Sequence, residues 1–199
     1  MAWIAQPSAF WSSGAYLVAL FASWIRIRQK TDALRLWLLS FGILGLASHF
    51  AHGSMTEVAM ACDFAGICLL LLTPGITRMA QNRVSIRALF LATPILFLAL
   101  TWSFYGSGKL TKIGIALVTF LFSMIEHKLN EPARIREPRF RKALAILVAS
   151  FLLFLWDESK THCEPTSWLH GHTLWHLGSA WAIYEYTRWR FLPPSAPEV

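Results

Sequence analysis

Residues 86–104, IRALFLATPILFLALTWSF, decide the fold class, because this long apolar stretch contains a single charged side chain, Arg87. A helix needs about 20 predominantly apolar residues to cross a bilayer. Six further apolar stretches accompany it, and each is predicted as a helix because a bilayer tolerates no unpaired backbone groups. The seven predicted helices are Ala9–Ile27, Leu34–Gly53, Met55–Thr73, Ile86–Phe104, Leu110–Ile125, Arg141–Trp156 and Leu169–Trp189.

The composition of the whole chain also indicates a membrane protein. The chain has 199 residues, of which 55% are hydrophobic and 15% charged, with a mean hydropathy of +0.46. A soluble domain carries about 25% charged residues. No Lys or Arg precedes Arg26, so the first stretch is expected to be a retained helix rather than a signal peptide. Residues 1–199 are therefore predicted to form one domain, an all-α integral membrane bundle of seven transmembrane helices.

The basic residues predict how this bundle lies in the membrane. Fifteen of the 18 Lys and Arg residues fall after the first, third, fifth and seventh predicted helices; the exceptions are Lys109, Lys112 and Lys160. Because loops rich in Lys and Arg face the cytosol, we expect the N-terminus outside and the C-terminus in the cytosol. The net charge of +7 then reflects topology and contact with anionic headgroups, and no nucleic-acid partner is expected. Tryptophans near the predicted helix ends are interpreted as interface belts, namely Trp11, Trp102, Trp156, Trp168 and Trp189.

Polar side chains within the predicted spans are the candidates for function, because ionisable groups there are costly. One set falls in the non-cytosolic halves of the second, third and seventh helices, at similar depth. It consists of Ser48, His49, His52, Asp63, His170, His172 and His176. Glu126 and His127 are expected at the cytosolic end of the fifth helix, where the interface can solvate them. Glu185 is expected either to reach the cytosolic headgroups or to pair with Arg188. Three cysteines are too few for a disulfide framework, and Cys62 and Cys68 are expected to pack within the third helix.

His172 and His176 are four residues apart and therefore share one helical face, which is the spacing by which paired histidines bind zinc from a helix. With His52 they would give three imidazole ligands and an open fourth position, the pattern of a catalytic zinc site. Zinc lowers the pKa of water in that position to about 7, and Asp63 could then exchange a proton with it. His49 remains an alternative third ligand. A structural role stays open for Asp63, and Ser48 could simply bond back to its own helix.

The pattern of these residues resembles the alkaline ceramidases. That family belongs to a superfamily of seven-helix zinc hydrolases which includes the adiponectin and progestin receptors and the Per1 lipid-remodelling proteins. The similar motifs are Ser48-x3-His52, Asp63 eleven residues later, His172-x3-His176 on the last helix, and the segments LWDESKTHC (155–163) and CEPTSWLHGHTLWHLGSAWAIYEY (163–186). The resemblance implies His52, His172 and His176 as zinc ligands, Asp63 as the proton-handling group and Ser48 as a hydrogen-bonding group of the site.

The resemblance further implies a zinc-dependent lipid amidase that hydrolyses ceramide or a related N-acyl lipid to a fatty acid and a free amine. The alternatives are a zinc-dependent esterase that remodels lipids and a receptor-like zinc bundle without activity. Animal alkaline ceramidases bind calcium through an acidic, cysteine-bearing N-terminal segment, whereas MAWIAQPSAFWSS lacks Asp, Glu and Cys, so calcium is not expected. Short loops favour a bacterial plasma membrane over an endomembrane, with the site toward the non-cytosolic side. The lipid headgroup, the oligomeric state and the roles of Cys163 and Glu185 are left open.

Overall fold

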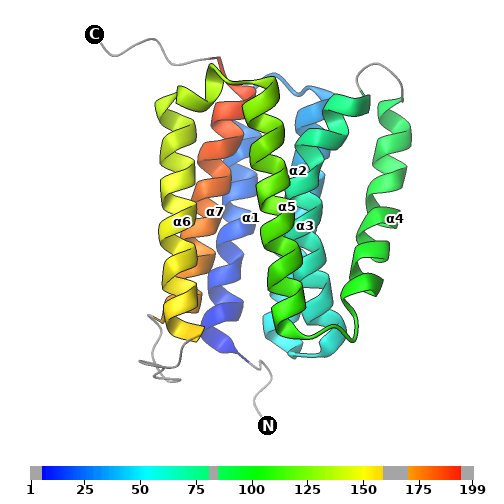
Figure 1. Ribbon diagram of the computed structural model, residues 1–199, viewed down its shortest axis with the longest axis vertical. Coiled ribbons are helices and arrows are strands. Elements are labelled where there is room, and N and C mark those ends of the chain that lie inside the picture. The colour runs from blue at the N-terminus through cyan, green and yellow to red at the C-terminus, as the bar shows by residue number, and fades with distance from the viewer. Residues whose placement is uncertain (1–5, 81–84, 159–169, 194–199) are drawn as a thin grey trace. The chain divides into compact units, whose positions relative to one another are not determined.

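The computed structural model describes residues 6–80, 85–158 and 170–193, and the regular structure of this part is entirely helical (Figure 1). Each of the seven predicted helices is present among the described residues, which contain no strand. The all-α fold class is therefore confirmed. The helices are α1 (Pro7–Arg26), α2 (Asp32–Ser54), α3 (Glu57–Ala80), α4 (Ile86–Phe104), α5 (Lys109–Asn130), the short 3-10 helix η1 (Arg134–Arg136), α6 (Pro138–Glu158) and α7 (Gly171–Phe191).

Local signals in the sequence fix several helix ends. Thr31 precedes α2 and Ser85 precedes α4, and each hydroxyl oxygen accepts a hydrogen bond from the backbone N–H three residues later, at 3.2 and 3.3 Å. Such caps satisfy donors that a helix start leaves unpaired. After α2, Met55 adopts a left-handed conformation (φ 52°) and donates its N–H to the Ala51 carbonyl at 2.8 Å. The chain therefore turns sharply and begins α3 two residues later.

Helix α3 runs farther than the sequence predicted, because the proline inside it does not end it. The predicted end at Thr73 is wrong, and the helix continues to Ala80. Pro74 lacks a backbone N–H. The Thr77 hydroxyl donates to the carbonyl oxygens of Thr73 and Pro74, at 2.9 and 2.8 Å. The carbonyl of Leu70 loses its helical N–H donor at Pro74, and α3 nevertheless continues beyond it.

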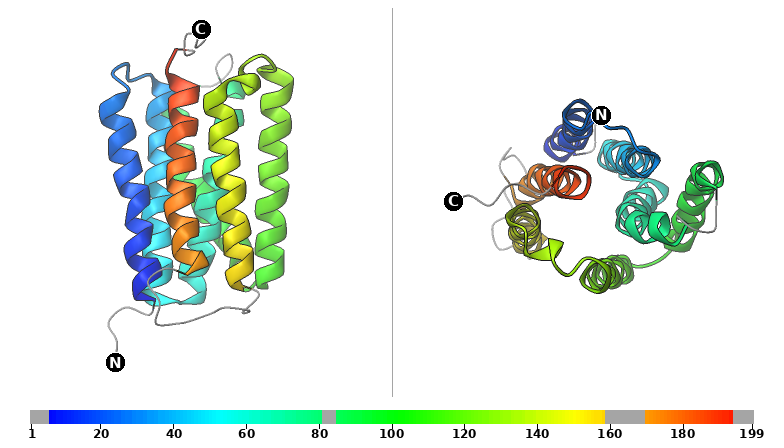
Figure 2. Two further views of the ribbon diagram at one scale, coloured as in Figure 1. Left: turned by 90° about the vertical axis from the view of Figure 1, so that its left-hand side faces the viewer. Right: turned by 90° about the horizontal axis from the view of Figure 1, so that it is seen from above.

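The contacts between helices divide the chain into two compact units, each described by itself. The first unit contains α2, α3, α4 and α5, and α3 packs against the other three helices (Figure 2). The second unit contains α1, η1, α6 and α7, and α7 packs against both α1 and α6. Each unit thus has one central helix that carries polar residues singled out in the sequence. The prediction that residues 1–199 form one domain stays a prediction.

Within the first unit, α2 and α3 approach each other closely at Gly66. A Cβ atom on Gly66 would lie 3.0 Å from the Cα atom of Leu44, closer than side chains normally pack. The two helices run antiparallel, so one turn onward from Leu44 along α2 corresponds to one turn back from Gly66 along α3. These positions are Ser48 and Asp63. The close contact at Gly66 therefore brings these two polar side chains together.

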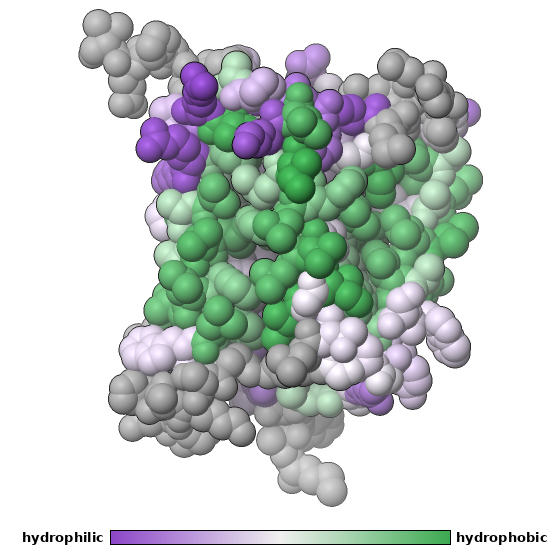
Figure 3. Space-filling model, viewed as in Figure 1, coloured by the Kyte–Doolittle hydropathy of each residue, from purple (hydrophilic) through white to green (hydrophobic). Residues whose placement is uncertain are grey.

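Five helices are long and apolar enough to cross a membrane, namely α1, α2, α3, α4 and α5. Helices α6 and α7 are equally long but carry too many charged or polar side chains to meet the same measure. The surface over α5 is hydrophobic along most of its length (Figure 3), and α4 exposes Leu91, Ile95 and Leu98 one turn apart. These features are consistent with a multi-pass membrane protein. The count of seven spans and their orientation stay predictions.

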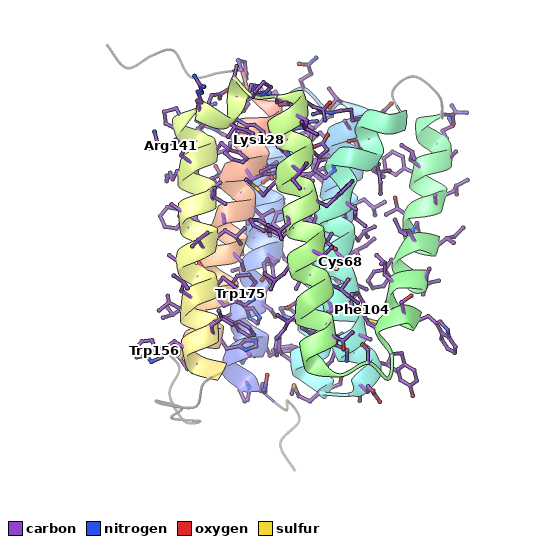
Figure 4. All side chains as sticks on the ribbon, in the orientation of Figure 1. Cys68, Phe104, Lys128, Arg141, Trp156 and Trp175 are labelled. Atoms are coloured by element: carbon purple, nitrogen blue, oxygen red, sulfur yellow. The ribbon has the colours of Figure 1, made fainter. Side chains whose placement is uncertain are left out.

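Basic residues gather at one end of each unit. In the first unit, Arg35 lies near the start of α2, and Arg78 and Lys128 lie near the ends of α3 and α5. In the second unit, Arg141 lies in the first turn of α6 and Arg190 in the last turn of α7. Figure 4 labels Lys128 and Arg141 as examples. This segregation within each unit is what the predicted positive-inside topology requires.

The sequence predicted that the tryptophans near helix ends lie at the membrane interface. Not all of them lie on the surface in the structure. The exposed ones are Trp11, Trp102 and Trp156. Trp168 lies outside the described residues. For Trp189 the prediction is wrong, because this side chain is 0% exposed. Its indole N–H donates to the Arg134 carbonyl at 2.9 Å, and its ring packs on Phe140 with 4.7 Å between centroids. Trp189 is therefore part of the interior of the second unit.

The end of α5 also differs from the prediction. The helix continues to Asn130, beyond the predicted end at Ile125. Solvation by the interface was expected for Glu126 and His127, yet Glu126 pairs with Arg78, with 3.0 Å between Oε1 and Nε. His127 is buried, and its Nδ1–H donates to a backbone carbonyl one turn earlier at 2.6 Å. Both side chains thus have protein partners in the structure.

Candidate metal centre

Three histidines lie close together in the structure: His52 on α2, and His172 and His176 on α7. One ring nitrogen from each can be chosen so that all three atoms lie within 4.8 Å of one another. His52 and His176 are buried, and His172 is half-buried. These three residues, called the histidine cluster below, could bind a metal ion, as the sequence predicted.

His52 lies in the last turn of α2 and is held by Gln6. The Gln6 backbone N–H donates to the His52 carbonyl at 3.1 Å. The His52 ring nitrogen Nδ1 lies 2.7 Å from the Gln6 side-chain oxygen Oε1. Because that oxygen only accepts hydrogen bonds, Nδ1 carries the proton and Nε2 keeps its lone pair for a ligand. A metal-binding histidine is ordinarily oriented by such a second partner.

His176 is oriented in the same way from α1. Its Nδ1 lies 3.0 Å from the carbonyl oxygen of Ala9 and 3.0 Å from the Ser12 hydroxyl. The Ser12 hydroxyl itself donates to the Ala9 carbonyl at 3.0 Å. A carbonyl only accepts, so Nδ1 again carries the proton and Nε2 is the nitrogen with a lone pair. Two members of the cluster therefore present the same ring nitrogen.

His172 is positioned by the packing of α7 on α6. A Cβ atom on the preceding Gly171 would lie 2.2 Å from the Leu153 carbonyl oxygen, so only glycine fits at this contact. The backbone N–H of His172 donates to Asp157 Oδ2 at 3.1 Å. The His172 ring packs edge-on against Phe154, with 5.4 Å between centroids. The first turn of α7, which contains His172, is thus fixed against the end of α6.

Ser48 and Asp63 form a pair beside the helix face that carries His52. The Ser48 hydroxyl is a hydrogen-bond partner of the Asp63 carboxylate, and Ser48 is buried. Ser48 precedes His52 by four residues, so both lie on one face of α2. The structure thus brings the predicted Ser48 and Asp63 together. Asp63 is not a member of the histidine cluster, and its role in proton transfer stays a prediction.

The chemistry of the cluster fits a metal ion. Imidazole nitrogen is a preferred ligand of zinc and related transition metals. Tetrahedral zinc, with Zn–N distances of about 2.0 Å, would separate its ligand atoms by about 3.3 Å. Three imidazoles leave one of four positions for water or substrate.

The other histidines of the predicted set lie outside the cluster. His49, the alternative ligand, is not a member of the group that the described residues form. His170 caps α7: its Nδ1 accepts from the Thr173 backbone N–H at 3.4 Å, and its Nε2 lies 2.6 Å from the Ser8 hydroxyl. Its predicted interfacial position stays a prediction, and the structure shows its ring half-buried between α1 and the start of α7.

Glu185 also lies on α7, about 13 Å along the helix axis from His176. It is buried, with Lys142 Nζ 2.8 Å from its Oε1 and Arg188 Nη1 3.0 Å from its Oε2. The Trp181 indole N–H also donates to Oε1 at 3.3 Å. The predicted pairing of Glu185 with Arg188 is confirmed, and Lys142 is the partner that the sequence did not show. Cys163 lies outside the described residues.

Sequence analysis missed the groups that orient the histidines. Gln6, Ser12 and Asp157 contact them through hydrogen bonds. The available signal was a polar side chain beside an apolar stretch: Gln6 precedes Pro7 at the start of α1, and Asp157 follows the apolar part of α6. Such residues are common at helix ends, so their roles become evident only from the contacts.

No family model, curated protein or solved structure matches this chain in the comparisons with known proteins. The histidine cluster and the Ser48–Asp63 pair are thus the basis on which a function is assigned.

Proposed function

We propose that this chain is a zinc-dependent hydrolase of the membrane that cleaves the amide bond of ceramide or a related N-acyl lipid. The observation that carries the proposal is the histidine cluster, in which one ring nitrogen each of His52, His172 and His176 lies within 4.8 Å of the others. The Ser48–Asp63 pair lies next to His52 along α2 and α3. Five apolar helices supply the membrane setting in which a lipid substrate is found.

Zinc is the metal that the donor set favours. Three neutral imidazoles with an open fourth position are typical of catalytic zinc, whereas structural zinc sites use four protein ligands, mostly cysteines. Calcium and magnesium prefer oxygen ligands, and the cluster offers nitrogen. When bound, zinc supplies a Lewis acid that polarises a carbonyl oxygen and makes water more acidic.

Asp63 and Ser48 supply the remaining chemistry. Asp63 accepts a proton from the attacking water as the water oxygen bonds to the amide carbon, and it returns that proton to the leaving nitrogen as the C–N bond breaks. Ser48 holds the Asp63 carboxylate in place and offers a hydroxyl to oxygen atoms of the reacting group. The products are a fatty acid and a free amine, so atoms and protons balance without a further reactant.

The substrate class and the location belong to the same proposal. The likeness of the serine, histidine and aspartate motifs to the alkaline ceramidases favours an amide over an ester. The predicted topology places the site in the non-cytosolic half of the membrane, near the depth of an amide bond just below lipid headgroups. We assign the chain to a bacterial plasma membrane on its short loops.

The proposal is tested on the full chain purified in a neutral detergent. Elemental analysis is expected to give about one zinc ion per chain, and incubation with ceramides is expected to release fatty acid, detected by mass spectrometry. A parallel panel of glycerolipids separates amide from ester cleavage. Zinc-loaded protein that releases fatty acid from glycerolipids alone would establish the esterase instead.

Asp63→Asn separates an enzyme from a bundle that zinc merely holds together. The enzyme is expected to lose turnover by about a hundredfold or more, because the proton acceptor is removed, while zinc content and the unfolding midpoint stay unchanged. Glu57→Gln, at the exposed start of α3, is the matched control and should keep its activity. A wild-type protein that retains zinc yet cleaves neither amides nor esters would contradict the enzyme and favour a structural zinc site.

A further inference from the structure

Helices α6 and α7 approach each other so closely that a side chain on either of two glycines would collide with the facing helix. A Cβ atom on Gly171 would lie 2.2 Å from the Leu153 carbonyl oxygen. Two turns onward along α7, a Cβ atom on Gly178 would lie 1.8 Å from the Ser150 hydroxyl oxygen. Small residues allow membrane helices to pack at such short range. Large side chains between these two contacts find no room between the helices and must lie to the side.

Three aromatic rings gather at this place. Phe151 and Phe154 of α6 stack, with 6.0 Å between their ring centroids. Trp175 of α7, labelled in Figure 4, contacts both of them, at 5.8 and 5.9 Å between centroids. All three residues are half-buried, so part of each stays accessible. These three residues are called the aromatic surface below.

The aromatic surface borders the histidine cluster. The Phe154 ring meets the His172 ring edge-on, with 5.4 Å between centroids. Trp175 lies about one turn onward from His172 along α7, and Phe151 lies about one turn back from Phe154 along α6. A chain that starts beside His172 and follows these two helices therefore meets Phe154 first and the other two rings next.

We propose that the aromatic surface binds the acyl chain of the N-acyl lipid and makes the enzyme selective for long chains. This inference rests on the proposed hydrolase. With the amide carbonyl at the histidine cluster, the acyl chain begins beside Phe154 and continues along Phe151 and Trp175. Aromatic rings offer a large apolar area, and each methylene that covers it is removed from water. A short acyl group ends before it reaches the farther rings and gains nothing from them.

The test compares two ceramides that differ only in the acyl group, N-octadecanoylsphingosine and N-acetylsphingosine, with the full chain in neutral detergent. Phe151→Ala removes one ring from the path of the long chain, so kcat/KM for the octadecanoyl substrate is expected to fall by about tenfold. For the acetyl substrate it should change by less than about twofold. Zinc content should stay unchanged, because the ring that borders His172 is that of Phe154.

Phe21→Ala is the matched control, because it removes an exposed phenylalanine of α1 in the same unit. It should keep the wild-type ratio of the two kcat/KM values. Trp175→Leu carries the same expectation as Phe151→Ala and serves in its place should that protein not fold. Equal losses on both ceramides, or no loss on either, would overturn the proposal and leave the hydrolase standing.

Binding of octadecanoic acid, the product of the proposed reaction, gives a readout that needs no turnover. In native mass spectrometry, the fraction of wild-type chains that retain this fatty acid is expected to exceed that of Phe151→Ala by about fivefold or more. Equal retention by the two proteins would overturn the aromatic surface as the chain site. A wild type that retains the fatty acid in this way yet cleaves no ceramide would contradict the hydrolase and support the chain site alone.

Discussion

Helix α7 carries buried polar side chains toward both of its ends, and the two sets are completed in different ways. Toward the C-terminal end, the oxygens of Glu185 are occupied by Lys142, Arg188 and the indole of Trp181. Toward the N-terminal end, His176 has one ring nitrogen occupied by the Ala9 carbonyl, while the histidine cluster brings ring nitrogens together.

This contrast distinguishes two reasons why a membrane helix carries a buried polar side chain. The Glu185 carboxylate pairs with Lys142 and Arg188 within the protein, so the cluster around Glu185 joins α6 to α7. The nitrogens of the histidine cluster are of one kind, and together they could bind a cation. The cost of burial in a bilayer applies to both sets. The two sets therefore differ in the partners of their polar groups and not in their burial.

The largest effect is expected when one histidine of the histidine cluster is removed. His176→Ala removes one of three nitrogen ligands, so bound zinc should fall by about tenfold or more from one ion per chain, measured by elemental analysis. Glu185→Gln, on the same helix, should keep its zinc. His49→Ala is a further control, because His49 stands outside the cluster. Zinc lost from His49→Ala and retained in His176→Ala would contradict the ligand assignment.

The next largest effect is expected on stability, when the cluster around Glu185 loses its carboxylate. Glu185→Gln should lower the free energy of unfolding by about 2 kcal/mol, because two cations lose a buried carboxylate. The half-exposed Lys142 keeps this value below that of a fully buried pair. Asp32→Asn removes a carboxylate from an exposed pair with Arg35 and should cost less than about 0.5 kcal/mol. Chemical denaturation in detergent measures both. Equal losses would show that the buried cluster is not a distinct stabilising element.

A smaller effect should follow when a residue that orients a histidine of the cluster is replaced and the histidine itself is kept. Gln6→Ala leaves the His52 Nδ1–H without its acceptor, so zinc affinity should weaken by about 10- to 100-fold, measured by competition with a chelator. Ser12→Ala is the matched control, because His176 keeps the Ala9 carbonyl as its acceptor. Its affinity should change less than threefold, or about 0.6 kcal/mol. A Gln6→Ala protein with wild-type affinity would contradict the orienting role.

The smallest effect is expected at Trp189, which also belongs to the interior near the C-terminal end of α7. Trp189→Phe removes the N–H that donates to the Arg134 carbonyl and should lower the free energy of unfolding by about 1 kcal/mol. Trp156→Phe, at an exposed position, should change it by less than about 0.5 kcal/mol. The reverse order would restore the interpretation of Trp189 as a lipid-facing residue.

Much of this architecture could be predicted, because apolar length and helical spacing are local properties of a sequence. The helix over 86–104 has the predicted bounds, and the four-residue spacing of His172 and His176 places both in the histidine cluster. The third member of the cluster, His52, was predicted from its depth near the outer end of the second helix, and His49 was left open as the alternative. These inferences needed no knowledge of which helices touch.

The remaining features depend on contacts between distant parts of the chain. Trp189 was assigned to the interface because tryptophans at helix ends commonly lie there, yet Arg134, 55 residues earlier, covers it. Helix α3 continues beyond Pro74, and it packs against α2, α4 and α5. Gln6 lies 46 residues from the histidine that it orients. Local patterns cannot indicate pairs of this kind.

The short connection between α2 and α3 has a consequence for biogenesis. Only Met55 and Thr56 separate the two helices, so we expect them to leave the insertion machinery together as a helical hairpin. The Thr73 hydroxyl donates to the Ser40 hydroxyl across this hairpin at 2.9 Å, and Asp63 has its own hydroxyl partner on the facing helix. The carboxylate therefore enters the hydrocarbon already shielded, and the later helices need not be present to make its insertion tolerable.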